Sequence, residues 1–264
     1  MVLSATSRFD GPSGRLSISF GVMTASAGTL RQCAGCRVVH AGQAFVEILT
    51  QPLTLRVMLC MSDRPPLCVV VNGPSAAGKS TLAGAVQDHL DEPLLRFGVD
   101  ELYRMVPGQW AGGVVGARYA VERGFSYQDV PELPGTRRIQ VGPDAIAMLL
   151  AMNAAIVAML TSGVGVIVDG QAFEPQVNAD LERRLADLRA QGLARVAVIE
   201  LVAADEPLAD RQRRHRHPAG LSLHQNTLPK QAANPDLVVE TSGLSAGEVA
   251  QVVCDWLDHE YRAS

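Results

Sequence analysis

Short apolar runs alternate with segments of helical periodicity from residue 67 to the end of the chain. The runs are rich in valine, isoleucine and leucine and end at polar residues or glycine. This pattern is typical of strands buried on both faces of a parallel sheet. It predicts strands at residues 67–72, 95–99, 164–169, 196–202 and 237–240.

The segments between these strands carry apolar residues at spacings of three and four, which places them on one face of a helix. We predict helices at residues 81–90, 101–105, 142–160, 178–191, 208–217 and 245–261. The last begins with Ser245 and Glu248, a capping-box pattern. Strand–helix alternation implies parallel pairing, so we expect an α/β fold of three layers, a five-stranded parallel sheet with helices on both faces.

One stretch, residues 145–168, is almost wholly apolar and resembles a membrane span in its composition. Asn153 lies inside it, however, and Thr161, Ser162 and Gly163 divide it into two pieces. We interpret the pieces as a buried helix and a core strand, and we expect no membrane partner.

Two regions depart from the alternation. Residues 107–141 mix proline, glycine and aromatic residues, and we expect an irregular insertion there. Residues 1–60 are rich in small and polar residues, and we expect a poorly ordered extension ahead of a folded domain at 61–264. Met58 and Met61 raise the hypothesis that the true translation start lies near them. The Cys33–Cys36 pair with His40 is a weak metal or redox signal, because no second cysteine pair accompanies it.

Composition narrows the class of partner. The 264 residues carry a formal net charge of −4 and a pI near 5.9, so we expect neither nucleic acid nor an anionic membrane as a partner. The five cysteines are an odd number without a disulfide framework, which favours the reducing cytoplasm.

The clearest motif follows the first strand. Gly73-x-x-x-x-Gly78-Lys79-Ser80 lies between an apolar strand and a helix, the context of a phosphate-binding loop (P-loop). Its backbone N–H groups and the helix N-terminus surround phosphate oxygens, the Lys79 ammonium binds the β- and γ-phosphates, and the Ser80 hydroxyl is a ligand for Mg²⁺. We therefore expect ATP and Mg²⁺ to bind at Gly73, Pro74, Ser75, Ala76, Ala77, Gly78, Lys79, Ser80 and Thr81.

Two aspartates end predicted strands. Asp169 follows Val-Ile-Val, the position at which loop-type nucleotide enzymes hold Mg²⁺; a cap on the next segment is the alternative. Asp100 ends the second strand, where it suits a general base for an attacking hydroxyl or, equally, an N-cap for the next helix. Parallel strands end at one edge, so both should face the P-loop.

A basic run, residues 211–217, contains Arg211, Arg213, Arg214, Arg216 and His217. A solvated helix face or a nucleic-acid-binding patch is one interpretation. The other is a basic lid segment after the fourth strand, whose arginines neutralise charge during phosphoryl transfer, with Arg211 among the nucleotide-binding residues. His215, His217 and His224 have no metal-ligand spacing with a cysteine, and we assign them no metal.

These motifs resemble the chloramphenicol phosphotransferase family of P-loop kinases. The likeness lies in the P-loop, in Phe97-Gly98-Val99-Asp100, and in the helix that opens at Gly142-Pro143 and leads to Val168-Asp169; it covers about residues 66–258. The resemblance implies a five-stranded kinase fold and an enzyme that transfers the γ-phosphoryl group of ATP to an antibiotic hydroxyl. It also implies that Asp100 is the general base and that a catalytic arginine falls at or near Arg214.

The acceptor stays open. A small hydroxylated drug or metabolite is the first hypothesis. A metabolic kinase for shikimate, gluconate or adenylyl sulfate, or a zeta-like toxin kinase for a nucleotide sugar, is the second. An anionic acceptor would need basic residues in the insertion, which contains Arg118, Arg123, Arg137 and Arg138. A regulatory nucleotide-binding module without turnover is the third.

Overall fold

The computed structural model describes residues 3–10, 15–22, 64–112, 117–215 and 218–262. The chain divides into two compact units, residues 1–55 and 56–264. In the first, strands β1 (Leu3–Asp10) and β2 (Arg15–Val22) pair antiparallel, with Leu3 opposite Val22 and Asp10 opposite Arg15. No strand was predicted there, although alternate residues 16, 18, 20 and 22 are apolar. The extension proposed for residues 1–60 stays a prediction, and Cys33, Cys36, His40, Met58 and Met61 lie outside the described residues.

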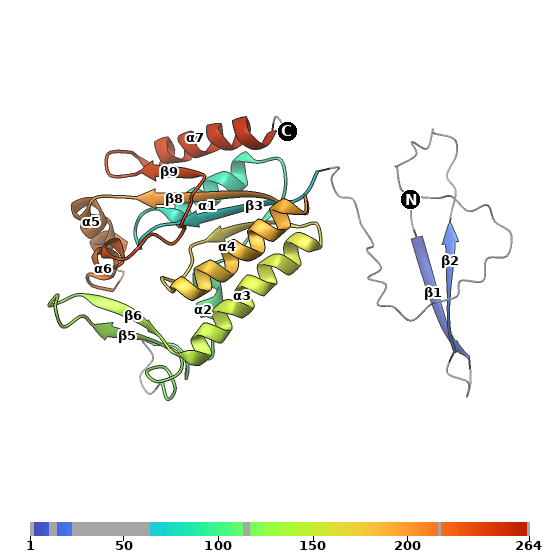
Figure 1. The fold of residues 1–264 in the computed structure, drawn as a ribbon, viewed down its shortest axis with the longest axis horizontal. Helices are drawn as coiled ribbons and strands as arrows, with labels where there is room; N and C mark the ends of the chain where they lie inside the picture. Colours follow the sequence, from blue (N-terminus) through green and yellow to red (C-terminus); the bar gives the residue numbers. More distant parts are fainter. Residues whose placement is uncertain (1–2, 11–14, 23–63, 113–116, 216–217, 263–264) are drawn as a thin grey trace. The chain divides into compact units, whose positions relative to one another are not determined.

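The second unit is built on a five-stranded parallel sheet in the order β4-β7-β3-β8-β9 (Figure 1). This confirms the predicted sheet. Its strands are β3 (Leu67–Asn72), β4 (Leu94–Arg96), β7 (Gly165–Asp169), β8 (Arg195–Val202) and β9 (Leu237–Glu240). β3, at the centre, is buried along its whole length, as expected of a strand covered on both faces.

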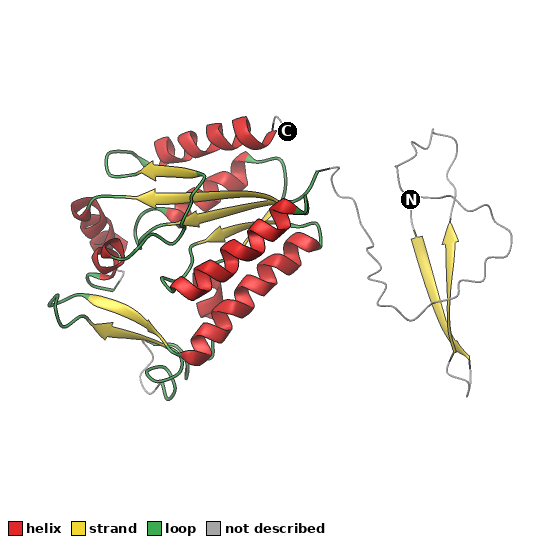
Figure 2. Ribbon diagram, viewed as in Figure 1, coloured by secondary structure: helices red, strands yellow, loops and turns green. Residues whose placement is uncertain are grey.

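Helices cover both faces of the sheet and complete the three layers (Figure 2). Alternate β3 residues Leu67, Val69 and Val71 pack in one core with α1 (Lys79–His89) and α7 (Ala246–Leu257). Cys68 and Val70 face a second core that includes α3 (Pro143–Thr161) and α4 (Pro175–Ala190). The period-two alternation of strand side chains divides one apolar run between two cores.

Helix α3 is the one helix in the described part of the chain that is long and apolar enough to cross a membrane, with a mean hydropathy of 1.9. It packs against α4 and β7, and a stripe of its residues that includes Leu149, Ile156 and Leu160 is fully buried. Asn153 is also buried and donates to the carbonyl oxygen of Val177 and to Asp180. The predicted helix followed by a core strand is therefore observed.

The insertion at 107–141 is more regular than predicted. Strands β5 (Phe125–Asp129) and β6 (Arg137–Val141) form an antiparallel pair, with Phe125 opposite Val141 and Tyr127 opposite Ile139. The prediction of an irregular segment was wrong for the hairpin at residues 125–141, because cross-strand pairs of apolar side chains supply the order that no local period revealed. The described residues between 107 and 124 form no helix or extended strand, as predicted.

Smaller differences concern element boundaries and short helical elements. β4 ends at Arg96, and α2 (Val99–Met105) starts earlier than predicted. Helix α5 (Asp205–His215) begins at its acidic residues, and α6 (Leu221–Thr227) was not predicted. The C-terminal helix passes into a π-helical turn, η2 (Asp258–Arg262).

Candidate active site

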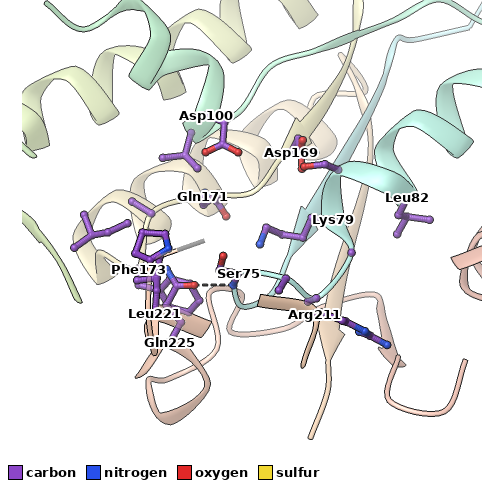
Figure 3. Close-up of a pocket in the computed structure, with 18 of the residues that line it drawn as sticks. Ser75, Lys79, Leu82, Asp100, Asp169, Gln171, Phe173, Arg211, Leu221 and Gln225 are labelled. Carbon is purple, nitrogen blue, oxygen red and sulfur yellow. Dashed lines mark hydrogen bonds between the residues drawn. The ribbon is translucent and has the colours of Figure 1, made fainter. Parts of the chain in front are cut away.

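The P-loop joins the carboxyl end of β3 to the N-terminus of α1. Gly73 has φ 132°, and a Cβ there would lie 2.5 Å from the carbonyl oxygen of Leu201, so only glycine fits this turn. Gly78, with φ 104°, is the N-cap of α1, which begins at Lys79. Residues 75–81 line one cavity of about 520 Å³ at this edge of the sheet (Figure 3). This is the strand–loop–helix geometry of an anion site.

Lys79 is half-buried at the mouth of the loop. Its ammonium donates to the carbonyl oxygens of Gly73 at 2.9 Å and Pro74 at 2.8 Å. Burial lowers the pKa of Lys79, and the carboxylates of Asp169, Asp100 and Glu200 act in the opposite direction. Three acidic groups therefore favour the charged ammonium that a phosphate would contact.

Asp100 lies in the first turn of α2, on the wall of the same cavity. The prediction that it ends a strand was wrong, since β4 stops at Arg96 and Gly98 is the N-cap of α2. A Cβ at Gly98 would lie 2.2 Å from the carbonyl oxygen of Asp169, so glycine lets this connection approach the end of β7. The close approach brings Asp100, Asp169 and Lys79 to one cavity, and the Asp100 carboxylate is exposed to it.

Asp169 ends β7 and is buried, with 3% of its surface exposed. Arg96 from β4 donates its Nε–H to Asp169 Oδ2 at 2.8 Å, and a second guanidinium nitrogen donates to the same oxygen. Asp169 Oδ1 is buried and has no hydrogen-bond partner among the described residues. Arg96 was not predicted as a site residue, because nothing in its local pattern shows which carboxylate lies across the neighbouring strand.

The donor set fits Mg²⁺ of the kind held mainly by substrate phosphates. Ser80 at the start of α1 and Asp169 with its unpartnered Oδ1 both line the cavity. Within the described ranges, no three His, Cys, Asp or Glu side chains cluster as a metal cage. Mg²⁺ in nucleotide enzymes does not need such a cage, since one or two protein ligands and the phosphates suffice. Ser80 and Asp169 as metal ligands stay predictions.

The basic segment contributes one arginine to the cavity lining. Arg211 lies there and donates to the hydroxyl of Thr241 at 3.0 Å and to its carbonyl oxygen. Arg214 is exposed, pairs with Asp210 one helical turn earlier, and is not part of the cavity lining. Arg216 and His217 lie outside the described residues. The nucleotide role of Arg211 and the catalytic role of Arg214 stay predictions.

The side of the cavity beyond Asp100 is apolar and aromatic. The insertion, α2 and the loop after β7 supply this wall, formed by Val99, Tyr103, Tyr127, Ile139, Val141, Ala172 and Phe173. Burial raises the pKa of both Tyr103 and Tyr127, and the negative charge of Asp100 adds to the effect. Burial also raises the pKa of Glu174 at the rim.

The four arginines of the insertion, all in the described part of the chain, lie outside this lining. Arg123 pairs with Asp144 at 2.7 Å and lies over the Trp110 ring, 5.0 Å from its centroid. Arg137 lies 3.5 Å from Asp129, and Arg118 lies over the Tyr119 ring. For three of the four, the structure thus gives a partner within the insertion itself.

Two glutamines from the segment after α5 hold the P-loop, and neither was predicted as a site residue. Ser75 N–H donates to Gln225 Oε1 at 2.7 Å, drawn as the dashed line in Figure 3. Gly73 N–H donates to Gln231 Oε1 at 2.9 Å, and Gln231 Nε2 donates to the carbonyl oxygen of Gln171. These pairs are up to 158 residues apart in the sequence, so no motif spacing could have revealed them.

Several solved kinase structures are similar to this chain at a distance. A sugar kinase from Janibacter sp. HTCC2649, in an unliganded structure, is 20% identical with a TM-score of 0.48, covering 74% of this chain and 95% of its own. The APS kinase of Mycobacterium tuberculosis, in complex with AMPPNP and APS, is 20% identical with a TM-score of 0.45, over 74% and 99%. A gluconokinase from Sinorhizobium meliloti 1021 is 18% identical with a TM-score of 0.47, over 74% and 94%. At these values the likenesses carry no argument about function.

No curated protein matches the chain. The model of the family described as chloramphenicol phosphotransferase-like protein matches residues 67–258, which spans the whole parallel sheet, the cavity and all of α7. Phosphoryl transfer is the activity for which that family is named, and the P-loop, the sheet order and the acid-lined cavity agree with it. The chain therefore belongs to the chloramphenicol phosphotransferase-like family and is a phosphotransferase with the P-loop kinase fold.

Proposed function

We propose that the protein transfers the γ-phosphoryl group of ATP to a hydroxyl of a small, aromatic or apolar molecule, with an antibiotic such as chloramphenicol as the first candidate. One observation carries the proposal: a single cavity is lined at one end by the P-loop and at the other by an aromatic wall, with Asp100 among its residues. Phosphoryl transfer depends mainly on positioning and electrostatics, and this cavity offers both. The cytoplasm is the proposed compartment, since ATP is its common phosphoryl donor.

The residues have distinct roles in the proposed reaction. The P-loop amides and Lys79 bind the phosphates. Ser80 and Asp169 would hold Mg²⁺, which when bound neutralises charge on the phosphate oxygens. Asp100 accepts the proton of the acceptor hydroxyl as its oxygen bonds to the γ-phosphorus, and the bond from that phosphorus to ADP breaks. Arg211 adds positive charge on the nucleotide side of the cavity.

The acceptor wall favours an uncharged acceptor over the metabolic alternatives. Shikimate, gluconate and adenylyl sulfate are anions, and an anion in this cavity would face Asp100 and Glu174 without an arginine from the insertion. Burying an unpaired anion beside carboxylates is costly. Aromatic side chains such as Tyr103, Tyr127 and Phe173 instead favour stacking against a ring.

The test is a transfer assay on the full chain. The protein is incubated with Mg-ATP and a panel that contains chloramphenicol, other hydroxylated antibiotics, shikimate, gluconate and adenylyl sulfate. Mass spectrometry should find a gain of one phosphoryl group on an uncharged aromatic compound. Phosphorylation of the anionic compounds alone would refute the proposed acceptor class, and ATP binding without any transfer would favour the regulatory module.

A further inference from the structure

The P-loop amide of Ser75 is engaged by a side chain from a distant helix. Gln225 lies on α6, is half-buried, and accepts the Ser75 N–H at 2.7 Å through its carboxamide oxygen. Both residues line the cavity, and Figure 3 shows the carboxamide pointing to the loop from the side of Leu221 and Phe173. Gln225 is thus placed between the phosphate loop and the acceptor wall.

A phosphate oxygen and the Gln225 carboxamide oxygen would compete for the same donor. P-loop N–H groups bind anions because they converge on one small volume next to a helix N-terminus. A nucleotide phosphate that takes the Ser75 N–H must first displace Gln225. The cost of breaking that hydrogen bond is then subtracted from the nucleotide's binding free energy.

Helix α6 connects the two halves of the cavity. The turn that precedes α6 is hydrogen-bonded to the insertion, since the Arg137 N–H of β6 donates to the carbonyl oxygen of Ala219 at 2.9 Å. Leu221 at its first turn lines the cavity together with Ile139 and Val141 of β6. Gln225 therefore joins the loop amide to a helix that borders the acceptor wall.

The second glutamine provides the contrast. Gln231 is 3% exposed, and both ends of its carboxamide are hydrogen-bonded, to Gly73 N–H and to the Gln171 carbonyl oxygen. It anchors the base of the loop and is not part of the cavity lining. Gln225, by contrast, lines the cavity and accepts the N–H of Ser75, which lines the same cavity.

We infer that Gln225 is a positioning residue that competes with nucleotide phosphate for the Ser75 N–H and so couples nucleotide binding to the position of α6 beside the acceptor. The inference rests on the proposed function, because it takes a nucleoside triphosphate as the competing ligand. Linkage then requires that nucleotide and acceptor affect each other's affinity by the same factor.

Calorimetric titration of the full chain with Mg-AMPPNP tests this competition. Gln225→Ala and Gln225→Met both remove the carboxamide, and Met keeps the side-chain length. We expect each to bind AMPPNP about 2- to 10-fold more tightly than the wild type, the net value of one hydrogen bond. Gln225→Glu should bind more weakly, because a carboxylate holds the N–H with a charge-assisted bond and repels phosphate. A purely structural role would weaken binding in all three.

Asn226→Ala is the matched control on the same helix. Asn226 Nδ2 donates to the carbonyl oxygen of Ala203 and to Asp205, so its loss loosens α6 without freeing Ser75. Its AMPPNP affinity should stay within about twofold of wild type. Tightening equal to that of Gln225→Ala would refute a specific role for Gln225.

The same titrations separate the two proposals. Wild-type binding of AMPPNP with unchanged or weaker binding in Gln225→Ala and Gln225→Met overturns the inference alone. A wild type that binds no AMPPNP overturns the proposed function and this inference together. In the transfer assay, the KM for ATP should fall in Gln225→Ala while kcat changes little, and the factor by which acceptor changes nucleotide affinity should move toward one.

Discussion

Arg96 donates its Nε–H to Oδ2 of Asp169 at 2.8 Å, and the other oxygen of that carboxylate is buried without a hydrogen-bond partner among the described residues. The two residues lie on neighbouring parallel strands, β4 and β7. Arg96 thus fixes the carboxylate through Oδ2 and leaves Oδ1 available to another ligand. This pairing orients a buried acid at the edge of the sheet, in the cavity that Lys79 also lines.

Loss of Arg96 should destabilise the fold. Arg96→Leu leaves a carboxylate that is 2% exposed without its cation, so the free energy of unfolding should fall by about 2–3 kcal/mol. This is less than for a fully buried pair, because a third of the Arg96 side chain is exposed. Urea unfolding measures it. Arg104→Leu, which breaks an exposed pair with Glu101, should cost less than about 1 kcal/mol, and equal losses would contradict the assigned role of Arg96.

Asp100→Asn should separate binding from chemistry. The amide keeps the shape but cannot accept the acceptor's proton, so transfer should fall by about 10²–10⁴-fold while Mg-ATP affinity stays near that of the wild type. Single-turnover transfer and calorimetry measure the two quantities. Glu101→Gln is the control, because Glu101 lies next on the same helix turn and outside the cavity lining. Near-wild-type transfer in Asp100→Asn would remove Asp100 from the mechanism.

Tyr127→Ala should affect the acceptor and not the nucleotide. Tyr127 lines the aromatic wall, and its loss should raise the acceptor KM by about 10-fold with little change in the KM for ATP. Arg137→Ala on the partner strand, which is outside the cavity lining, should leave both KM values within about twofold. A large rise in acceptor KM for Arg137→Ala would instead indicate an anionic acceptor.

Glu200 should make stability depend on pH. It is 2% exposed on β8, and burial raises its pKa to about 7, although a backbone hydrogen bond from Ala232 and the charges of Lys230 and Lys79 oppose the rise. The folded state then holds a proton that the unfolded state releases from about pH 4.5 upward. This contribution to stability is complete below about pH 4.5 and is lost as the pH rises to about 7.

The Glu200→Gln variant tests that sign. The amide stays neutral, so on the order of 2 kcal/mol of the decline in wild-type stability between pH 4.5 and pH 8 should disappear. Urea unfolding at several pH values checks it. Glu132→Gln, at an exposed position between β5 and β6, is the control and should retain the wild-type pH profile. A Glu200→Gln profile identical to wild type would mean that Glu200 does not carry the predicted proton.

The insertion shows why some elements could not be predicted. Phe125 and Tyr127 alternate correctly for a strand, but their partners Val141 and Ile139 follow a turn that contains two prolines and a glycine. The hairpin forms because the paired side chains pack against each other and, at Phe125, against Tyr103 with ring centroids 4.7 Å apart. Such contacts depend on which segments meet, and a local period does not record that.

The candidate site likewise contains parts that local sequence predicts and parts that depend on contacts between distant segments. The local sequence by itself determined the central strands, the main helices and the P-loop, because burial on two faces, helical periodicity and glycine spacing are properties of neighbouring residues. Only the tertiary structure decided that Arg96 holds Asp169 and that Gln225 holds Ser75. These partners are 73 and 150 residues apart, and they meet because parallel strands end at one edge and the segment after β8 folds back over it. Hydrogen bonds between distant segments follow from packing, which no spacing within a motif encodes.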